Sequence, residues 1–427
     1  MNKPRVLVMA EAANPELVSV PLVGWSLANA LRSVADVHIV TQVRNRDAFL
    51  RAGLKEGTDF TSVDTEKVAA PLWRFSKLFG PGAWTAKQAL SAIPDAYFER
   101  MVWQRFGAGI TAGEWDIVHR VTPLTPTKPS YVARQCAKVG VPFVLGPLNG
   151  GVPWPKGFDK ERRREGEWLS YVRSAYKLLP MRGATLTAAS AIMVGSKFTM
   201  GEIPQVHSAK TIYLPENGID VERFHLQAAP AAGDGPLRAC FVGRMVPYKG
   251  ADMLIEAAAP LLKAGKLTLT LIGDGPMLPE LKQSVVSLGL DGTVEFSGWL
   301  VHAQVQKVMA SCDLLTFPSI REFGGGVVLE AMALGLPPLV VDYAGPGELV
   351  QSKWGYTIPI GPRADIIRDL RDALEQLIIE PQELLKKGMA ARARVEETFT
   401  WSQKAAQVAQ VYDWVRAPVG PAPTLID

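Results

Sequence analysis

The feature that most constrains the fold is a regular alternation of short, wholly apolar segments with longer segments of helical pattern. The apolar segments are predicted to be strands, and they form two series. The first is Arg5–Ala10, Val37–Gln42, Asp116–Val121, Pro142–Gly146, Ala191–Gly195 and Thr211–Pro215; the second is Leu237–Val242, Leu267–Gly273, Val294–Ser297, Leu314–Pro318, Pro338–Asp342 and Tyr356–Ile360. Continuous apolar runs are typical of parallel strands covered on both faces. Their alternation with helices therefore predicts right-handed βαβ crossovers and doubly wound sheets.

Two domains are expected from the length and from one break in composition. A chain of 427 residues has room for two or three domains. The break lies near residues 205–236, where Asn217-Gly218 is a turn signal and residues 228–236 have the composition of a linker. We therefore expect one Rossmann-like domain over residues 1–210, joined by a C-terminal helix over 401–416, and a second over 218–398.

Charge, cysteine content and apolar runs exclude several classes of protein. The net charge of +4 is too small to indicate a nucleic-acid partner, and three cysteines without close pairs argue against a disulfide framework or a zinc site. The first apolar run, Val6–Ala10, is too short for a signal peptide. The longest, Gly324–Val341, contains Glu330 and a pair of prolines, so it predicts a helix, a turn and a strand. We expect a soluble, cytoplasmic protein.

A glycine-rich turn is the sharpest motif. Residues 319–330 read SIREFGGGVVLE and lie between a predicted strand and a helix predicted over residues 325–334. The first turn of a helix carries unpaired N–H groups and the positive end of the helix dipole, so phosphate can bind there. Glu322 and Glu330 can border the same anion site and accept hydrogen bonds from sugar hydroxyls. For either glutamate alone, a helix cap or a surface acid is an equally good explanation.

Two cations follow the first strand of the second series. Residues 241–250 read FVGRMVPYKG. Open α/β sheets bind ligands at the carboxyl ends of their strands. Arg244 and Lys249 suit a diphosphate there. The guanidinium of Arg244 is planar and can donate two hydrogen bonds side by side, and the ammonium of Lys249 is a compact charge. Each cation alone would be explained by an exposed, solvated position. A third motif is the turn Gly273-Asp274-Gly275, for which a tight connection between strand and helix is at least as good an explanation as a ligand contact.

Together these three motifs resemble the C-terminal domain of retaining glycosyltransferase family 4, also called group 1. Glu322 and Glu330 reproduce its E-x7-E spacing, and Arg244 with Lys249 reproduces its G-R…K-G pair. The similarity runs almost continuously from about residue 215 to 400, and includes Asn217-Gly218-Ile219-Asp220, Gly273-Asp274-Gly275, Phe296-Ser297-Gly298 and the run from Glu330 to Pro337. The family pattern is E-x-F-G, whereas here Phe323 directly follows Glu322, so the donor sugar is left open.

The resemblance implies the GT-B fold, with two doubly wound Rossmann-like domains that face each other across a cleft. It implies transfer of a hexosyl unit from a UDP- or GDP-linked sugar to a saccharide or lipid-linked saccharide, with retention. Glu322 would bind the donor sugar, Glu330 the ribose, and Arg244 and Lys249 the leaving diphosphate. The remaining predicted donor contacts are Gly243, Gly273, Phe323, Gly324, Gly325, Gly326 and Val327. Many other glycosyltransferases hold a divalent metal ion with a D-x-D motif. No two aspartates of this sequence stand two residues apart, so neither a metal ion nor a cofactor is expected.

The first half is less typical of the family, whose usual Gly-Gly pair after the first strand is absent. Residues 115–120 (WDIVHR) and 146–151 (GPLNGG) look like members that build bacterial polysaccharides. On this basis we expect His119 at a strand's carboxyl end, facing the cleft as a catalytic, sugar-contacting residue. The predicted acceptor contacts are Gly24, Asn149 and Gly150.

Two segments rich in basic and aromatic residues predict contact with an anionic membrane, on the inner face of which a lipid-linked acceptor would lie. They are residues 72–87 and residues 160–179. In the second segment the residues predicted to share one helical face are Trp168, Val172, Ala175, Tyr176 and Leu179. Basic amphipathic helices that contain tryptophan often lie at a membrane surface. A helix face buried against the first sheet would show the same periodicity.

Three rival functions stay open. One is a nucleotide-sugar epimerase or an inverting transferase on the same fold. A second is a dinucleotide oxidoreductase, which is disfavoured because no G-x-G-x-x-G follows the first strand. The third is a non-catalytic sugar-nucleotide-binding subunit, which would normally have lost Glu322, Arg244 or Lys249.

Overall fold

The computed structural model describes residues 3–76, 84–165, 180–228 and 235–426. Contacts divide the chain into two compact units. Unit 1 comprises Met1–Gly151, Gly166–Gly218 and Trp401–Asp427, and unit 2 comprises Val152–Glu165 and Ile219–Thr400. The predicted N-terminal domain ran unbroken to residue 210. The structure instead assigns residues 152–165 to unit 2, because this segment packs on loops of the second sheet.

Unit 1 is built on a seven-stranded sheet of order β3-β2-β1-β4-β5-β6-β7, in which every pairing is parallel. The strands are β1 (Arg5–Ala10), β2 (Asp36–Gln42), β3 (Phe60–Val63), β4 (Ile117–Thr122), β5 (Phe143–Leu148), β6 (Ala191–Val194) and β7 (Thr211–Tyr213). The helices are α1 (Val20–Leu31), α2 (Arg46–Arg51), α3 (Glu66–Ser76), α4 (Trp84–Thr111), α5 (Tyr131–Val139), α7 (Pro180–Ala188), α8 (Lys197–Gly201) and α16 (Trp401–Arg416).

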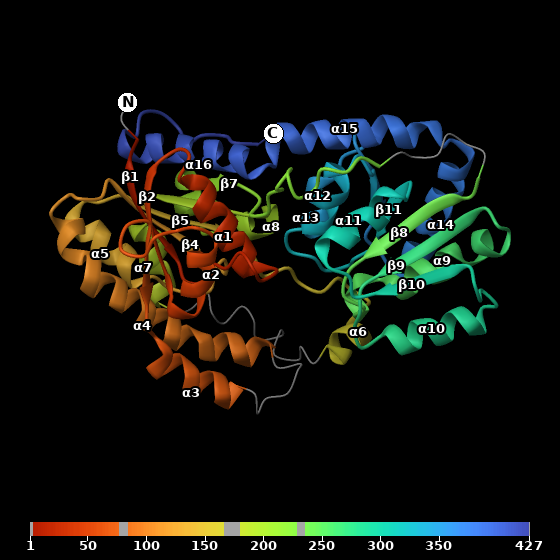
Figure 1. Cartoon of the computed structure of the whole chain (residues 1–427), viewed down its shortest axis with the longest axis horizontal. Coiled ribbons are helices and arrows are strands. Elements are labelled where there is room, and N and C mark those ends of the chain that lie inside the picture. The colour runs from red at the N-terminus through yellow and green to blue at the C-terminus, as the bar shows by residue number, and fades with distance from the viewer. Residues whose placement is uncertain (1–2, 77–83, 166–179, 229–234, 427) are drawn as a thin grey trace. The chain divides into compact units, whose positions relative to one another are not determined.

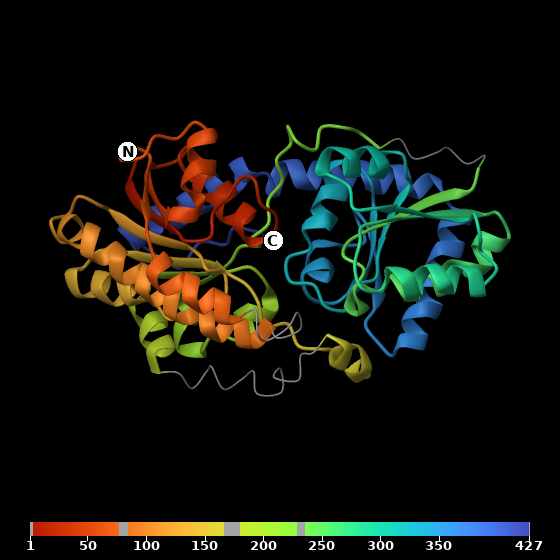
Figure 2. The same ribbon diagram turned by 60° about the horizontal axis from the view of Figure 1, so that its bottom comes forward.

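Alternation along β1 shows how this sheet is covered on both faces. Val6 and Val8 belong to a core that includes residues of α1 and α16, whereas Leu7 and Met9 belong to a core with residues of α4, α5 and α7. Successive side chains of a strand point to opposite faces, so a strand with two buried faces is apolar at every position. Figures 1 and 2 show these helices on the two faces of the sheet.

Unit 2 is built on a six-stranded parallel sheet of order β10-β9-β8-β11-β12-β13. The strands are β8 (Leu237–Val242), β9 (Leu267–Ile272), β10 (Val294–Gly298), β11 (Leu314–Phe317), β12 (Pro338–Asp342) and β13 (Tyr356–Pro359). The helices are α6 (Asp159–Arg164), α9 (Ala251–Lys263), α10 (Leu278–Ser287), α11 (His302–Ala310), α12 (Gly326–Ala333), α13 (Ala344–Leu349), α14 (Arg363–Ile379) and α15 (Gln382–Thr398), with a short 3-10 helix, η5 (Pro247–Lys249). Helix α9 packs on α14, and α12 packs on α15.

Every predicted strand is present, with small differences at the ends, and the two doubly wound α/β sheets confirm the predicted architecture. One strand, β3, was not predicted. Its sequence is Phe-Thr-Ser-Val, and the two central hydroxyl residues interrupt the apolar run on which the prediction relied. It lies at the edge of the sheet, next to β2.

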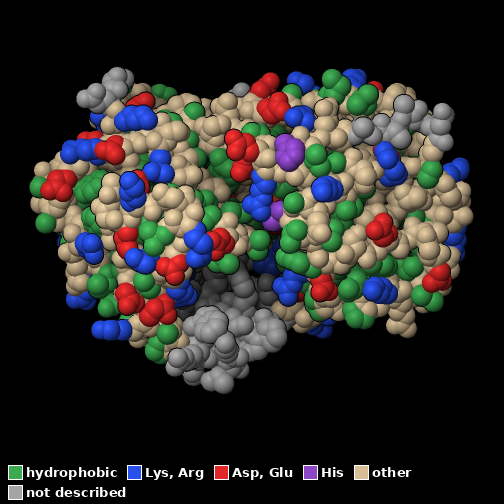
Figure 3. Space-filling view, in the orientation of Figure 1, with side chains coloured by type: hydrophobic (Ala, Val, Ile, Leu, Met, Phe, Trp, Pro, Cys, Tyr) green, Lys and Arg blue, Asp and Glu red, His purple; other side chains and the backbone are tan. Residues whose placement is uncertain are grey.

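The predicted membrane segments lie mainly outside the residues that the structure describes. Within the described part of residues 160–179, Arg164 donates to the Glu280 carboxylate at 2.5 Å. Over the described residues, no helix is both long and apolar enough to cross a bilayer. On the face shown in Figure 3, acidic and basic side chains are interspersed. Contact with a membrane surface stays a prediction.

Candidate active site

The two strongest motifs of the sequence meet at the centre of the second sheet. The chain adds β9 and β10 on one side of β8 and continues from β11 to β12 and β13 on the other, so the strand order reverses between β8 and β11. Ligands of open α/β sheets bind at such a switch point, outside the carboxyl ends of the strands. The loop after β8 carries Arg244 and Lys249, and the loop after β11 carries Glu322.

Backbone contacts tie these two loops together. The carbonyl of Tyr248 accepts hydrogen bonds from the amide of Ile320 at 2.9 Å and from the hydroxyl of Ser319 at 3.1 Å. Gly250 has φ 75°, and a Cβ there would lie 2.4 Å from the carbonyl oxygen of Pro318. Only glycine allows both this conformation and this approach. The chain on either side of Lys249 is thereby anchored to the loop that carries Glu322.

Lys249 and Glu322 form an ion pair that is largely shielded from solvent. The side chains are 14% and 20% exposed, and the Lys249 Nζ lies 4.8 Å from the centroid of the Phe317 ring. Burial lowers the pKa of Lys249 to about 7. A bound phosphate would add negative charge beside the amine and favour its protonated form. The pair thus offers a cation for phosphate and a carboxylate for hydroxyl groups, next to each other.

The glycine-rich turn ends at the start of α12. The helix begins at Gly326, after Gly325 at φ 60°, a conformation that favours glycine. No acidic side chain lies in its first turn. The first amides of a helix have no partner within it, so those of Gly326 and Val327 can donate to an anion.

Glu330 and Arg244 complete the predicted donor contacts. Glu330 lies in α12, and burial raises the pKa of its carboxyl group to about 7, although Arg223 acts in the opposite direction. Arg244 is exposed at the carboxyl end of β8. An exposed guanidinium at this point is free to turn toward a diphosphate.

The glycine at the end of β9 has a packing role. Gly273 has φ 134°, and a Cβ there would lie 2.0 Å from the carbonyl oxygen of Gly243. The two turns are therefore in backbone contact, which explains Gly273 without a ligand, whereas a Cβ at Gly243 would make only ordinary contacts at 3.4 Å and beyond. Their predicted contact with a donor stays a prediction.

His119 does not face solvent at the end of its strand, as the sequence predicted, and its predicted contact with a sugar stays a prediction. It is fully buried within β4, with Nδ1 2.7 Å from the Tyr412 hydroxyl and Nε2 2.7 Å from the carbonyl oxygen of Gly146. Burial lowers its pKa to about 4. The strand continues to Thr122, so His119 lies inside the sheet and its ring packs against α16 rather than facing solvent.

Removing the hydroxyl of Tyr412 tests this structural role. We expect Tyr412→Phe to lower the free energy of unfolding by about 1–3 kcal/mol, because it leaves a buried imidazole nitrogen without a partner. Urea-induced unfolding measures the change. Tyr356→Phe is the matched control, since the buried Tyr356 hydroxyl has no hydrogen-bond partner within the part of the chain that the structure describes. Equal losses in the two variants would contradict a specific contribution from His119.

The predicted acceptor contacts also have roles inside unit 1. The side-chain Nδ2 of Asn149 donates to both carboxylate oxygens of Glu216 at 2.7 Å. Its side-chain Oδ1 accepts from the Ser196 hydroxyl and from the backbone amide of Gly150. Asn149 is buried, so its side chain is occupied by this network rather than free for an acceptor. At Gly24, in α1, a Cβ would lie 2.2 Å from the carbonyl oxygen of Ala12, which explains that glycine by close packing.

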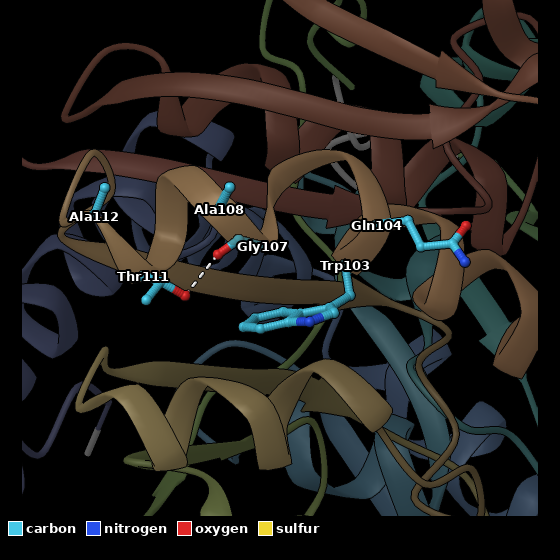
Figure 4. A pocket seen from close by; sticks show the side chains of 6 residues that line it. All are labelled: Trp103, Gln104, Gly107, Ala108, Thr111 and Ala112. Atoms are coloured by element: carbon cyan, nitrogen blue, oxygen red, sulfur yellow. Dashed lines mark hydrogen bonds between the residues drawn. The ribbon is translucent and has the colours of Figure 1, made fainter.

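One pocket lies away from all these residues, along α4 of unit 1. Figure 4 shows its lining: Trp103, Gln104, Gly107, Ala108, Thr111 and Ala112. The Thr111 hydroxyl donates to the carbonyl of Gly107 at 2.8 Å. None of the six lining residues is titratable in the range where acid–base chemistry operates, so this pocket is not a candidate active site.

Two residues beside the predicted site were absent from the prediction. Arg321 is buried and precedes Glu322, and Tyr248 precedes Lys249. The family pattern identified the residues that follow them, Glu322 and Lys249. Arg321 and Tyr248 themselves contact residues 152–154, which are far away in the chain. No local pattern in the sequence could have revealed those contacts.

The fold and the site define a protein of two Rossmann-like units with a candidate anion site at the switch point of the second sheet. Residues 223–392 match the family model of the glycosyl transferases group 1. Residues 223–392 are thus similar to the group 1 glycosyltransferases, and the resemblance seen in the sequence is confirmed.

Curated relatives agree with this match. The alpha-D-kanosaminyltransferase of Streptomyces kanamyceticus is 29% identical over 197 residues, 45% of this chain and 49% of that protein. The putative colanic acid biosynthesis glycosyltransferase WcaL of Salmonella typhimurium is 27% identical over 294 residues, 60% of this chain and 70% of that protein. The chain thus spans about half the length of some of the curated relatives that it matches.

The similarity to solved structures extends over both units. Anabaena Alr3699/HepE, crystallised in complex with UDP, matches with a TM-score of 0.62 and 17% identity, covering 96% of this chain and 99% of that one. At this level of identity the likeness shows the fold alone. It confirms the GT-B fold predicted from the sequence.

Proposed function

We propose that this protein is a glycosyltransferase that moves a hexosyl unit from a UDP- or GDP-linked sugar to a saccharide or lipid-linked saccharide, with retention and without a metal ion. The observation that carries the proposal is the Lys249–Glu322 pair beside the start of α12, at the switch point of the second sheet. The family match over residues 223–392 supports it. So does the UDP bound to Anabaena Alr3699/HepE, a protein of the same fold.

In the proposed reaction, the bond between the anomeric carbon and the diphosphate oxygen breaks through an oxocarbenium-like state. Negative charge develops on the leaving diphosphate. Lys249, Arg244 and the amides of Gly326 and Val327 stabilise this charge in a partly dehydrated site. When the donor phosphate replaces Glu322 as the partner of Lys249, the Glu322 carboxylate accepts hydrogen bonds from the donor-sugar hydroxyls.

The remaining steps concern the ribose and the acceptor. Glu330 accepts hydrogen bonds from the ribose hydroxyls. The acceptor hydroxyl attacks the anomeric carbon from the face that the diphosphate leaves, so the configuration is retained. The hydroxyl proton passes to the departing diphosphate, and the products are the glycosylated acceptor and a nucleoside diphosphate.

A panel of UDP- and GDP-linked sugars tests this function. The matching donor raises the melting temperature by mass action. Incubation of that donor with saccharide and lipid-linked acceptors, followed by NMR of the product, gives the anomeric configuration. An inverted product contradicts retention, and an epimerised free nucleotide sugar indicates an epimerase. Binding without any chemical change indicates a non-catalytic subunit.

The pKa values of Lys249 and Glu330 predict proton exchange when a nucleotide sugar binds. Both lie at about 7 in the free protein. Above pH 7 the neutral fraction of Lys249, which the neighbouring Glu322 carboxylate limits, must gain a proton to meet the diphosphate, so binding takes up protons and weakens as pH rises. At pH 6 Glu330 is mostly protonated and must lose its proton to accept two ribose hydroxyls, so binding releases protons.

Calorimetry in buffers of different ionisation enthalpy measures this exchange. Nucleotide sugars serve as the ligand because, unlike nucleoside diphosphates, they have no phosphate that titrates near pH 7. Lys249→Ala is expected to abolish the uptake at pH 8, and Glu330→Gln the release at pH 6. Exchange of the same sign at both pH values would contradict the assignment.

A further inference from the structure

One segment of unit 2 comes from the N-terminal half of the sequence and contacts the candidate active site. We call residues 152–165 the strap. Unit 1 includes the chain up to Gly151, and the strap that follows belongs to unit 2. Val152 and Phe158 are each 1% exposed. The strap is therefore a packed part of the second unit rather than a loose connection.

The first contact of the strap is with Arg321, the residue before Glu322. The Arg321 Nε donates to the carbonyl oxygen of Val152 at 3.2 Å. Its guanidinium carbon lies 5.2 Å from the centroid of the Trp154 ring and 5.5 Å from that of Phe323. Arg321 is 5% exposed. A buried cation requires hydrogen bonds and favourable ring contacts, and the strap supplies both.

The strap also contacts the loops after β8 and β12. The ring of Trp154 packs edge-on against Tyr248, with centroids 6.1 Å apart. The Tyr343 hydroxyl donates to the carbonyl oxygen of Pro153 at 3.0 Å. Helix α6 of the strap contacts η5, which contains Lys249. One segment thus holds three strand-end loops, two of which carry the residues of the candidate site.

We propose that Trp154 is a positioning residue for Glu322. Its indole ring and the neighbouring carbonyl of Val152 hold the Arg321 side chain, and Arg321 in turn fixes the backbone from which Glu322 projects. The proposal rests on the proposed function, because Glu322 is taken to bind the donor sugar. It adds a residue from the N-terminal half of the sequence to the machinery of the second unit.

The expected consequence is a selective loss of turnover. Without the indole ring, Arg321 loses its contact with residue 154 and the turn at 321–323 becomes looser. Small displacements of substrate-positioning groups cost large factors in rate, so we expect Trp154→Ala to lower kcat by about tenfold or more. The affinity for UDP or GDP should change little, because Lys249 and the amides of α12 remain.

Hydrogen exchange and kinetics together test the proposal. In the full-length, ligand-free protein, mass spectrometry follows exchange in peptides that cover residues 319–326, where the Ile320 amide is bonded to the carbonyl of Tyr248. We expect faster exchange there and a lower kcat in Trp154→Ala. Trp154→Phe, which keeps an aromatic face for Arg321, should restore both. Trp414→Ala, in α16 of unit 1, is the control and should change neither.

The outcomes separate this inference from the proposed function. Unchanged exchange and unchanged kcat in Trp154→Ala would overturn the inference. Faster exchange throughout unit 2, with Trp154→Phe equally damaged, would overturn it as well, because Trp154 would then serve general packing. If the wild type transfers no sugar from any donor but Trp154→Ala selectively loosens residues 319–326, the proposed function fails while the positioning of the turn is supported.

Discussion

Replacing Lys249 with alanine is expected to lower turnover by about 10²–10³, the effect typical of removing one group that stabilises charge in a transition state. The reason is geometric. Lys249 lies at the switch point of the second sheet, is paired with Glu322, and is shielded from solvent, so its charge acts in a site of low dielectric constant. Release of nucleoside diphosphate from the donor measures the rate.

Two controls accompany this variant. Lys386→Ala removes a cation that is 77% exposed on α15 and should leave turnover unchanged. Treatment of the wild type with EDTA should also have little effect, because Lys249 and Arg244 are proposed to meet the diphosphate charge. Loss of activity in EDTA that Mg²⁺ or Mn²⁺ restores would refute the metal-independent mechanism.

Replacing Glu322 with glutamine is expected to lower kcat by about 10² while the affinity for free nucleoside diphosphate is kept or increased. The substitution removes the charged group that accepts hydrogen bonds from the donor-sugar hydroxyls. It also removes the carboxylate that competes with phosphate for Lys249. Kinetics gives the first quantity and calorimetry with UDP or GDP the second. Glu375→Gln, at an exposed position of α14, is the matched control.

Glu330 provides the contrast within the same motif. Glu330→Gln should weaken nucleoside diphosphate binding and change kcat little at saturating donor, because Glu330 is proposed to bind the ribose rather than the reacting sugar. If both glutamate variants lose the same affinity, the division of roles between them is wrong.

Much of the fold was predictable because its determinants are local in sequence. Strands buried on two faces must be apolar at every position, and the structure contains each strand that this rule identified. The start of α12 was predicted to within one residue, since glycine at positive φ followed by a helical pattern is a local signal. Strand β3 escaped prediction because its Thr61 and Ser62 break the apolar run.

The motifs of the candidate active site were predictable in the same way, whereas the environment of other residues was not. Lys249 and Glu322 each follow a strand, and parallel strands bring their carboxyl ends to one edge. His119 also lies on a strand, but its surroundings depend on Tyr412, which is 293 residues away and packs from α16. Tertiary packing decides whether the side chain of a strand residue faces a ligand or a helix. The position of the strand in the sequence does not reveal which.

The sequence by itself therefore determined the two doubly wound sheets, the position of the glycine turn, and the placement of Arg244, Lys249 and Glu322 in loops that follow strands of the second sheet. Only the tertiary structure decided that His119 and Asn149 are internal, and that residues 152–165 belong to the second unit. The physical reason is that strand formation and helix capping depend on neighbours within a few residues. Burial and side-chain pairing depend on which distant segments come together, as Val152 and Trp154 do with Arg321.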